Sequence, residues 1–238
     1  MQITIIGYGR MGKEVESMAI SRDHKVILRI DMENTADFDS DLFDQSDVAI
    51  EFTTPDTAFD NISKCIKRGI PVVSGTTGWT DRLPLIRQQV ESEGGSFIHS
   101  SNFSIGVNIL FNLNMRLARI MDGITSYDVK LEEIHHIMKK DAPSGTAINL
   151  AEDIISECKR YKSWNSAESS GQDRIGIKSV REGQVTGTHK IEWNSDIDTI
   201  TIEHKAHSRQ GFALGAVFAA EFIHTRKGIF TMNDLLGF

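Results

Sequence analysis

Three glycines follow the first apolar run of the chain, where a strand would give way to a helix. Residues 1–7 form that run, and Gly7, Gly9 and Gly12 then stand in G-x-G-x-x-G spacing before a helical segment. A short, nearly continuous apolar run predicts a strand buried on both faces. Gly7 permits a tight turn, Gly9 a close backbone approach, and Gly12 close helix–strand packing. The pattern predicts a turn that binds a dinucleotide pyrophosphate at the helix N-terminus.

An acidic residue closes the second predicted strand. Asp31 stands 19 residues after Gly12, where a carboxylate accepts hydrogen bonds from the adenosine ribose hydroxyls. Asp31 would repel a 2′-phosphate, and its neighbour Met32 offers no cation, whereas Arg10 could reach such a phosphate from the glycine turn. We therefore expect NADH as the preferred cofactor, or dual use of NADH and NADPH.

Strands and helices alternate through the first hundred residues. The expected strands are residues 1–7, 24–31, 46–53, 70–78 and 95–103, and the expected helices are residues 12–21, 56–69 and 81–94. This alternation is typical of a parallel sheet with right-handed crossovers. Two loops, residues 51–55 and 74–78, fall at the carboxyl ends of strands, where such sheets bind ligands. Their small and hydroxyl side chains suit a nicotinamide ribose, although plain turns have the same composition.

The pattern changes near Ser104. An amphipathic helix is expected over residues 107–121, and its predicted apolar face consists of Leu110, Leu113, Leu117 and Ile120. The next expected elements are a strand at 127–136, a helix at 145–160 with Ile148, Ala151, Ile154 and Ile155 on one face, and a polar loop at 161–173. Extended segments at 175–183, 185–193 and 198–206, without helices between them, predict an open antiparallel or mixed sheet. A last helix is expected at 212–226.

The expected fold is therefore α/β with a second, α+β half. A Rossmann-type parallel-sheet domain would occupy residues 1–104, and a substrate-binding domain with the open sheet would occupy residues 105–211. The C-terminal segment, residues 212–238, could pack on either domain.

Histidines, lysines and a Pro-Ser-Gly-Thr turn gather in residues 132–149, EEIHHIMKKDAPSGTAIN. Ser144 is a plausible N-cap, and the backbone N–H groups of Gly145 and Thr146 behind it could bind a carboxylate. Either neighbouring lysine could add a full charge, and a histidine with an ordinary pKa of about 6.5 transfers protons near neutrality. A solvated surface loop would account for the same composition.

Overall composition narrows the classes of partner. The net charge of −7 argues against a general polyanion-binding role, so we expect no nucleic-acid partner. Cys65 and Cys158 stand far apart, which fits a reduced, cytoplasmic protein without a metal site. No signal peptide is expected. The longest apolar run, residues 212–223, is too short for a bilayer and contains Glu221, so we expect a buried helix and no membrane partner.

The string H-H-x-x-K-x-D-A-P-S-G-T, from His135 to Thr146, resembles the signature of the 4-hydroxy-tetrahydrodipicolinate reductase family, also called dihydrodipicolinate reductases, of lysine and diaminopimelate biosynthesis. The resemblance extends over nearly the whole chain. It includes GYGRMG, EFTTP, SGTTG, SSNFSIGVN, VREGQVTGTH, EHKAHSRQGFALGAV and GIFTMNDLL.

This resemblance implies NAD(P)H-dependent reduction of a small cyclic dicarboxylate that contains a conjugated imine. His135 would be the catalytic acid/base, and Lys139 a second proton donor that also holds the substrate. Further substrate contacts would come from His136, Ser144, Gly145 and Thr146. The nucleotide end of the cofactor would contact Gly7, Tyr8, Gly9, Arg10, Met11, Gly12 and Asp31. The nicotinamide end would contact Gly75, Thr76, Thr77, Ser100, Ser101, Asn102 and Phe103.

The resemblance also implies a homotetramer assembled through the open sheet, with the last helix returned to the nucleotide domain. The chain departs from the family pattern at Tyr8, Met32 and Thr54, and in a short segment between Asp31 and Asp47. These departures concern cofactor choice. Two alternatives are a different Rossmann reductase that acts on amino acids such as diaminopimelate or aspartate, and a non-catalytic, nucleotide-responsive binding module.

Overall fold

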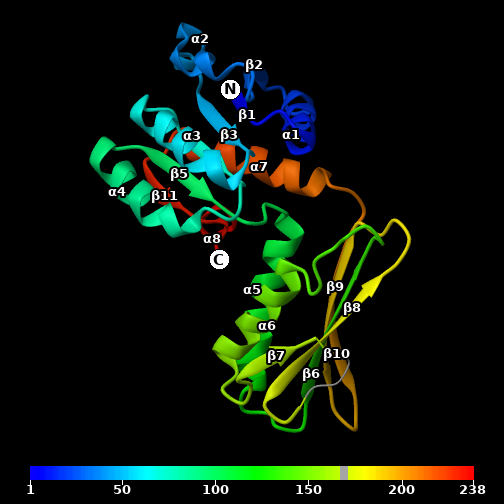
Figure 1. Cartoon of the computed structure of the whole chain (residues 1–238). Coiled ribbons are helices and arrows are strands. Elements are labelled where there is room, and N and C mark those ends of the chain that lie inside the picture. Colours follow the sequence, from blue (N-terminus) through cyan, green and yellow to red (C-terminus); the bar gives the residue numbers. More distant parts are fainter. Residues whose placement is uncertain (167–170) are drawn as a thin grey trace. The chain divides into compact units, whose positions relative to one another are not determined.

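The computed structural model describes residues 1–166 and 171–238, so the polar loop expected at 161–173 lies partly outside the described residues. The chain divides into two compact units. Unit 1 consists of Met1–Ile105 and Gln210–Phe238, and unit 2 of Gly106–Arg209. The chain therefore leaves unit 1 once and returns to complete it, as the colours of Figure 1 show.

Unit 1 is built on a six-stranded sheet in the order β11-β5-β4-β3-β1-β2. Its strands are β1 (Gln2–Ile6), β2 (Lys25–Ile30), β3 (Val48–Glu51), β4 (Val72–Ser74), β5 (Ser96–His99) and β11 (Gly228–Phe230). Every neighbouring pair is parallel, which confirms the predicted parallel sheet. β11 was not predicted from the sequence, because a three-residue strand has no periodicity to reveal it.

Helices cover both faces of this sheet (Figure 1). α1 (Arg10–Ser21) and α7 (Gln210–Ile223) lie on one face, and α3 (Pro55–Lys67) and α4 (Leu83–Glu93) lie on the other. Ile5 packs on the first face and its neighbour Ile6 on the second, as strand alternation requires. The apolar run 212–223 lies in α7, the buried helix that the sequence predicts. This helix packs so closely against the backbone at Phe103 that a Cβ on Gly215 would lie 1.7 Å from the carbonyl oxygen of Phe103.

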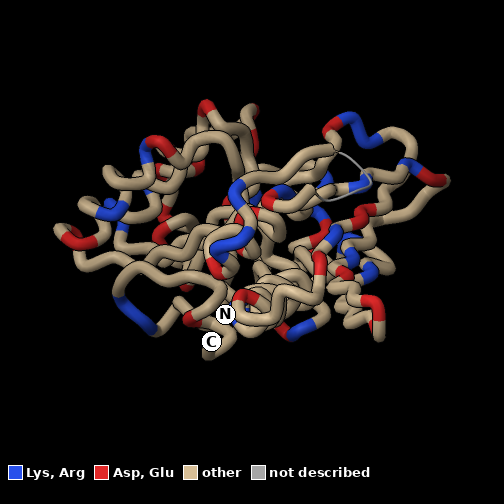
Figure 2. The backbone as a smooth tube through the Cα atoms, turned by 90° about the horizontal axis from the view of Figure 1, so that it is seen from below, with Lys and Arg blue, Asp and Glu red and all other residues tan. Residues whose placement is uncertain are grey.

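Short helices complete unit 1. They are the 3-10 turns η1 (Thr35–Asp39) and η2 (Thr80–Arg82), and the helices α2 (Asp41–Asp44) and α8 (Met232–Leu236). None of the helices in the described part of the chain has the length and apolar character needed to cross a membrane. Acidic and basic positions are interspersed along the backbone of both units (Figure 2).

Unit 2 contains a five-stranded sheet in the order β10-β9-β6-β8-β7. Its strands are β6 (Asp128–His135), β7 (Ser163–Asn165), β8 (Arg174–Arg181), β9 (Gly187–Asn194) and β10 (Thr199–Ala206). β9 is antiparallel to β6 and β10, whereas β8 is parallel to β6 and β7, so the sheet is mixed. α5 (Ile105–Met121) and α6 (Gly145–Glu157) pack on one face of the sheet (Figure 1).

The buried side of α5 differs from the prediction. Leu110 is buried, but Leu113 is 46% exposed and Ile120 is 63% exposed. Asn114 is buried instead, and its Nδ2 donates a hydrogen bond to the carbonyl oxygen of Leu150 in α6, at 2.9 Å. A short amide side chain that satisfies a buried carbonyl allows close helix packing, and apolar periodicity alone does not reveal such a pair. On α6 the predicted face is confirmed in part, since Ala151 and Ile154 are buried, whereas Ile148 and Ile155 are half-buried.

Candidate active site

The three glycines of the first turn occupy positions that suit only glycine or leave room for a ligand. Gly7 has φ +89°, and a Cβ there would lie 2.1 Å from the carbonyl oxygen of Phe52. A Cβ on Gly12 would lie 2.3 Å from the carbonyl oxygen of Gly7. A Cβ on Gly9 would meet no atom within 4 Å, so the backbone is open there. This arrangement fits a pyrophosphate at the N-terminus of α1, where free N–H groups favour anions.

A pocket of about 280 Å³ adjoins the glycine turn. It is lined by Ile6, Gly7, Gly9, Ile30, Asp31, Met32, Thr35, Phe38, Phe52, Thr53, Thr54, Thr57 and Asn61. Asp31 directly follows β2 and is the one charged residue among these described lining residues. Its Oδ1 accepts the N–H of Met32 at 2.9 Å. An exposed carboxylate in such a pocket suits ribose hydroxyls better than a 2′-phosphate.

The side chains around the phosphate turn form their own polar cluster. The hydroxyl of Tyr8 donates to the carboxylate of Glu16, and Arg29 forms an ion pair with the same carboxylate. The guanidinium of Arg29 also lies 5.7 Å from the centre of the Tyr8 ring. Arg10 and Met11 are the first residues of α1, and Arg10 is exposed. The cation that stands two positions before Asp31 is therefore already paired.

A buried carboxylate joins the two loops at the carboxyl ends of β3 and β4. Glu51 is 0% exposed, and its Oε1 accepts the N–H of Thr53 at 2.8 Å and the hydroxyl of Thr76 at 2.7 Å. Oε1 also accepts the Thr53 hydroxyl, and Oε2 accepts the Ser74 hydroxyl at 2.6 Å. These four donors are neutral. Glu51 therefore fixes loop 51–55 to loop 74–78 through hydrogen bonds alone.

The hydroxyl and the carbonyl oxygen of Thr76 both form hydrogen bonds within the protein. It is 5% exposed, and its hydroxyl accepts the N–H of Thr53 at 2.7 Å while donating to Glu51. Its carbonyl oxygen accepts Nε1–H of Trp79 at 2.7 Å and lies 3.1 Å from Nε2 of His99. Burial lowers the pKa of His99, so a neutral ring holds the loop. Neighbouring Thr77 is exposed and available to a ligand.

The remaining nicotinamide-end residues lie just beyond β5. The hydroxyl of Ser100 donates to the carbonyl of Asn102 at 2.8 Å, and Asn102 Oδ1 accepts the N–H of Ser104 at 2.8 Å. Ser101 is exposed. The ring of Phe103 is 2% exposed and meets the edge of Phe52 at 6.2 Å, so it belongs to the core of unit 1. A cofactor contact from Phe103 would have to come from its backbone.

The second polar centre lies in unit 2, where β6 ends. Glu133 is 0% exposed, His135 7% and His189 5%. Glu133 Oε2 lies 3.3 Å from His135 Nδ1 and 3.9 Å from His189 Nε2. Arg181 forms an ion pair with Glu133 Oε1 at 3.0 Å, and the N–H of Ser144 donates to Oε2 at 3.1 Å. Glu133 is therefore the hub of this centre.

Strand pairing explains how these residues meet. Glu133 pairs with His189 across β6 and β9, and His135 pairs with Arg181 across β6 and β8. Residues opposite each other in a sheet project their side chains on the same face. Two residues before Glu133 in β6, the same face carries Leu131, which belongs to the apolar core under the helices. One face of the sheet thus changes from hydrophobic core to polar site within two residues.

The two kinds of titratable group respond differently to this burial. Burial opposes the charge of Glu133, but the nearby His135, the N–H of Ser144 and the guanidinium of Arg181 outweigh it, and the pKa of Glu133 falls far below its usual range. Burial lowers the pKa of His189 to about 4, and the charge of His135 acts in the same direction. Near neutral pH the centre therefore holds an ionised Glu133 and a neutral His189.

A loop that carries the predicted lysine is tied to the same centre. Lys139 forms an ion pair with Asp141 at 2.7 Å. Arg181 holds the loop by donating Nε–H to the carbonyl of Lys139 at 3.3 Å and Nη2–H to the carbonyl of Asp141. His136, half-buried, follows the end of β6, and Lys140 is exposed. Arg181 therefore couples the position of this loop to Glu133.

The turn before α6 is the predicted helix cap. Ser144 is the N-cap, and its hydroxyl accepts the N–H of Ala147 at 3.3 Å and lies 3.2 Å from His189 Nε2. Its own N–H is donated to Glu133. Gly145 and Thr146 are the first helical residues, whose N–H groups have no intrahelical carbonyl partner. These two groups, rather than Ser144, suit an incoming carboxylate.

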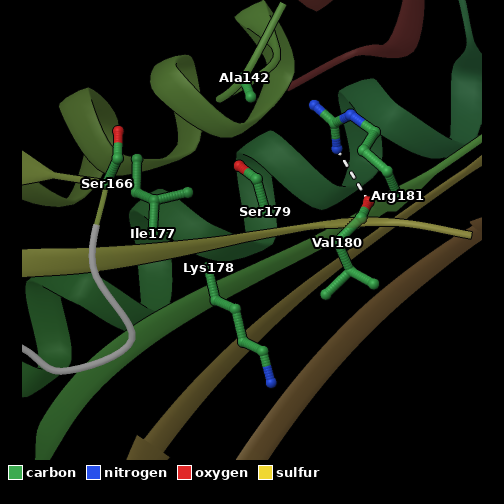
Figure 3. A pocket seen from close by; sticks show the side chains of 7 residues that line it. All are labelled: Ala142, Ser166, Ile177, Lys178, Ser179, Val180 and Arg181. Atoms are coloured by element: carbon green, nitrogen blue, oxygen red, sulfur yellow. Dashed lines mark hydrogen bonds between the residues drawn. The ribbon is translucent and has the colours of Figure 1, made fainter. Parts of the chain in front are cut away.

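A larger pocket of about 480 Å³ lies along β8. Its lining residues are Ala142, Ser166, Ile177, Lys178, Ser179, Val180 and Arg181. Figure 3 shows Lys178 and Arg181 on opposite sides of the strand. Lys178 pairs with Glu132 at 3.3 Å, and Arg181 pairs with Glu133, so both cations of the pocket are committed within the protein. The pocket adjoins the second polar centre through Arg181, which belongs to both.

Glu133, His135 and His189 also have the spacing of a metal-binding trio, since their ligand atoms lie within 4.8 Å of one another. The guanidinium of Arg181 pairs with Oε1 of the same carboxylate, and the Ser144 N–H occupies Oε2. A cation placed there would face the charge of Arg181. The donor set therefore fits a proton better than a metal ion.

Comparison with known proteins identifies the family of both units. The family model described as "Dihydrodipicolinate reductase, N-terminus" matches residues 1–103, and "Dihydrodipicolinate reductase, C-terminus" matches residues 106–236. The 4-hydroxy-tetrahydrodipicolinate reductase of Christiangramia forsetii is 48% identical over 99% of this chain and 98% of that protein. That of Methanopyrus kandleri is 39% identical over 80% of this chain and 71% of that protein.

A solved structure supports the fold. The dipicolinate-bound dihydrodipicolinate reductase from Paenisporosarcina sp. TG-14 has a TM-score of 0.78 at 24% identity, over 97% of both chains. Together, the two family models span both units, and the resemblance seen in the sequence motifs is confirmed. The chain belongs to the dihydrodipicolinate reductase family.

Proposed function

We propose that this chain reduces 4-hydroxy-tetrahydrodipicolinate, by way of dihydrodipicolinate, to tetrahydrodipicolinate in lysine and diaminopimelate biosynthesis, using NADH or NADPH. The observation that carries the proposal is the position of His135. This buried histidine lies against an ionised carboxylate that also accepts the N–H of the helix cap Ser144, in a chain whose other unit has an open dinucleotide turn. An acid and an anion site in one unit and a nucleotide turn in the other are the parts that such a reduction needs.

The residues of unit 1 fit a nicotinamide dinucleotide. Gly7, Gly9 and Gly12 would receive the pyrophosphate, and Asp31 the adenosine ribose, while the exposed positions Thr77 and Ser101 would meet the nicotinamide end. The bound cofactor supplies a hydride to C4 of the substrate ring. Glu51 keeps both loops at that end in place.

His135 is the proposed proton donor. Hydride addition at C4 places negative charge on the ring system, and the reaction is complete when a proton reaches C3. A positioned acid contributes roughly 10²–10⁴-fold to such a step. His189, the other buried histidine, is neutral because its pKa is about 4, so it is not the donor near neutral pH. Of the two buried histidines, His135 lies nearer to the carboxylate: its Nδ1 is 3.3 Å from Oε2 of Glu133, whereas Nε2 of His189 is 3.9 Å away.

The substrate carboxylates require cationic or N–H partners. The N–H groups of Gly145 and Thr146 would hold one carboxylate at the N-terminus of α6. Lys139 would exchange its partner Asp141 for a substrate carboxylate and would stabilise the negative charge of the transition state. His136 would add a contact from the loop after β6.

The pocket beside the glycine turn supports a preference for NADH. Asp31 is the charged residue among the described lining residues, and Arg29 is paired with Glu16. No cation of the lining would therefore neutralise a 2′-phosphate, so NADH is the preferred cofactor or one of two that are used.

Unit 2 would also mediate assembly into a cytoplasmic homotetramer. The face of its sheet away from the helices carries charges of both signs, such as Lys190 and Glu192, which form an ion pair at 3.0 Å. A face of this kind is suited to pairing with another copy of itself. Sedimentation equilibrium tests this, and a monomer at micromolar concentration would contradict it.

The decisive experiment measures substrate-dependent oxidation of NADH and NADPH side by side, with substrate generated in situ from pyruvate and aspartate semialdehyde. We expect oxidation of both or a preference for NADH, and none when the aldehyde is omitted. Lys139→Ala should weaken substrate binding and slow turnover, whereas Lys140→Ala, at an exposed neighbour, should change little. Tight NADH binding without oxidation would reject the proposed reaction.

A further inference from the structure

Glu133 neither gives nor takes a proton in the reaction described above, although it contacts three parts of the proposed site. It is 0% exposed, and it lies within 3.3 Å of the acid, His135, on one side. On its other sides it accepts the N–H of the helix cap, Ser144, and pairs with Arg181, which in turn holds the Lys139 loop. Burying a carboxylate costs free energy of folding unless charged and hydrogen-bonding partners compensate the lost hydration. The partners around Glu133 therefore form a specific arrangement within the site.

The imidazole of His135 has two distinct sides. Nδ1 faces Glu133, at 3.3 Å from Oε2. Nε2 faces Gly187 of β9, where a Cβ would lie only 3.1 Å away. Glycine therefore keeps the space next to Nε2 open. A carboxylate on one ring nitrogen fixes the tautomer and leaves the other nitrogen to transfer the proton.

We propose that Glu133 is the positioning residue of the proton donor. It holds Nδ1 of His135 so that Nε2 presents the proton in the space left by Gly187. The same carboxylate also fixes the positions of the Ser144 cap, by a direct hydrogen bond, and of the Lys139 loop, through Arg181. This inference rests on the proposed function, because it acts through the proton that His135 gives to the reduced ring. Glu133 itself does not touch the substrate.

Other charged and titratable groups face this pair from every neighbouring element. They are Arg181 from β8, His189 from β9, His204 from β10, and Lys139 and Asp141 from the loop after β6. Arg181 balances the charge of Glu133 and opposes a charge on His135. Glu133 lies in ion-pair distance of the ring, so its removal takes away a negative charge from beside the proton donor.

The test compares Glu133→Gln with wild type in NADH oxidation from about pH 5 to pH 10. We expect turnover to fall about 10- to 1,000-fold and its alkaline limb to move to lower pH, with the affinity for NADH retained. Glu132→Gln is the matched control, because this neighbour faces the other side of β6, where it pairs with Lys178. Glu133→Asp, which keeps the charge, should recover part of the lost turnover.

A double variant separates positioning from general structural support. If Glu133 acts through His135, then Glu133→Gln added to His135→Gln should cause little further loss. Additive losses, or an alkaline limb that does not move in Glu133→Gln, would overturn the inference. If wild type itself does not oxidise NADH with the substrate, the proposed function fails instead, so the two failures are distinguishable.

One measurement does not depend on a variant that folds. In wild-type protein labelled with ¹⁵N at histidine, the imidazole of His135 should carry its proton on Nδ1 when the ring is neutral. A neutral ring protonated on Nε2 alone would show that Glu133 does not hold the tautomer and would overturn the inference. Gly187→Ala provides a complementary test on the other nitrogen, and it should lower turnover while leaving NADH affinity intact.

Discussion

Glu51 in unit 1 and Glu133 in unit 2 are both completely buried carboxylates, and each lies at or near the end of a strand that leads into a loop of the candidate site. Their partners differ in kind. Glu51 accepts hydrogen bonds from hydroxyls and a backbone N–H, whereas Glu133 is paired with a guanidinium and lies against an imidazole. Burial alone therefore does not indicate what a carboxylate does.

The difference separates a structural role from a chemical one. Neutral donors fix the loops around Glu51 without adding a group that gains or loses a proton near pH 7. The charge of Glu51 still acts locally, since burial raises the pKa of the nearby Cys65 thiol and Glu51 raises it further. Around Glu133 one donor, Arg181, carries a full charge and another, the N–H of Ser144, belongs to the helix cap, so loop position and the helix cap are linked through this carboxylate.

The largest effect should come from His135→Gln, which removes the proton donor and leaves Glu133 in place. We expect turnover to fall roughly 10²–10⁴-fold, while the affinity for NADH, a property of unit 1, stays nearly unchanged. Steady-state kinetics and NADH titration by fluorescence measure the two quantities. Near-normal turnover would remove His135 from the chemistry.

Acid should weaken unit 2 through His189, whose pKa in the folded protein is about 4 instead of 6.5. Because the unfolded chain binds this proton more readily, the stability that neutral His189 provides is complete above pH 6.5 and is lost as the pH falls toward 4. The loss should reach about 3 kcal/mol. Urea unfolding at several pH values should give a flatter profile for His189→Gln than for the control His207→Gln, at an exposed position.

Glu51→Gln tests most directly whether Glu51 has a structural role, in contrast to the role in proton transfer that we propose for Glu133. The amide would direct a donor at the hydroxyls that now donate to Glu51, and this mismatch should lower the free energy of unfolding by about 1–3 kcal/mol. We expect a higher KM for NADH, but no shift in the pH dependence of turnover. Asp60→Asn, at an exposed site on α3, is the control for loss of charge. A shifted pH profile would show that Glu51 is coupled to proton transfer after all.

The smallest expected effect concerns Asp31, the exposed carboxylate of unit 1. Asp31→Ser combined with Met32→Arg should remove repulsion and add a cation for a 2′-phosphate. We expect the ratio of kcat/KM for NADPH over NADH to rise about tenfold, or roughly 1.4 kcal/mol. Glu33→Gln, which changes charge next to but outside the pocket lining, should leave that ratio nearly constant.

Local sequence patterns predicted the elements and part of each site. Spacing identified Gly7, Gly9 and Gly12, and composition identified the cap at Ser144, because these features depend on residues close together in the chain. The parallel sheet of unit 1 followed from alternating strands and helices and is confirmed. The roles of His135 and Lys139 came from resemblance to a family, and their part in the reaction stays a prediction.

Residues that meet across the sheet were missed. Glu133 and His189 lie 56 positions apart in the sequence and become neighbours only because β9 pairs with β6 in one particular register. Arg181 likewise depends on β8 lying parallel to β6. The stretches VREGQ and TGTH belonged to the recognised motifs, yet nothing local indicated that their charged side chains face a buried glutamate. Leu113 and Ile120 were predicted to be buried and are exposed. Apolar periodicity predicts a helix, but it does not determine which side of the helix a neighbouring element covers.

The return of the chain to unit 1 has a consequence for how the protein is made. Unit 2 is continuous, so residues 106–209 are complete before the ribosome adds α7. Unit 1 is not, because its core includes Ala213, Ala216 and Val217 of α7, and its sheet ends with β11. During synthesis, unit 2 can therefore fold first, whereas the sheet that carries the glycine turn is completed only when β11 has been synthesised. The unit that begins the sequence is the last to be completed.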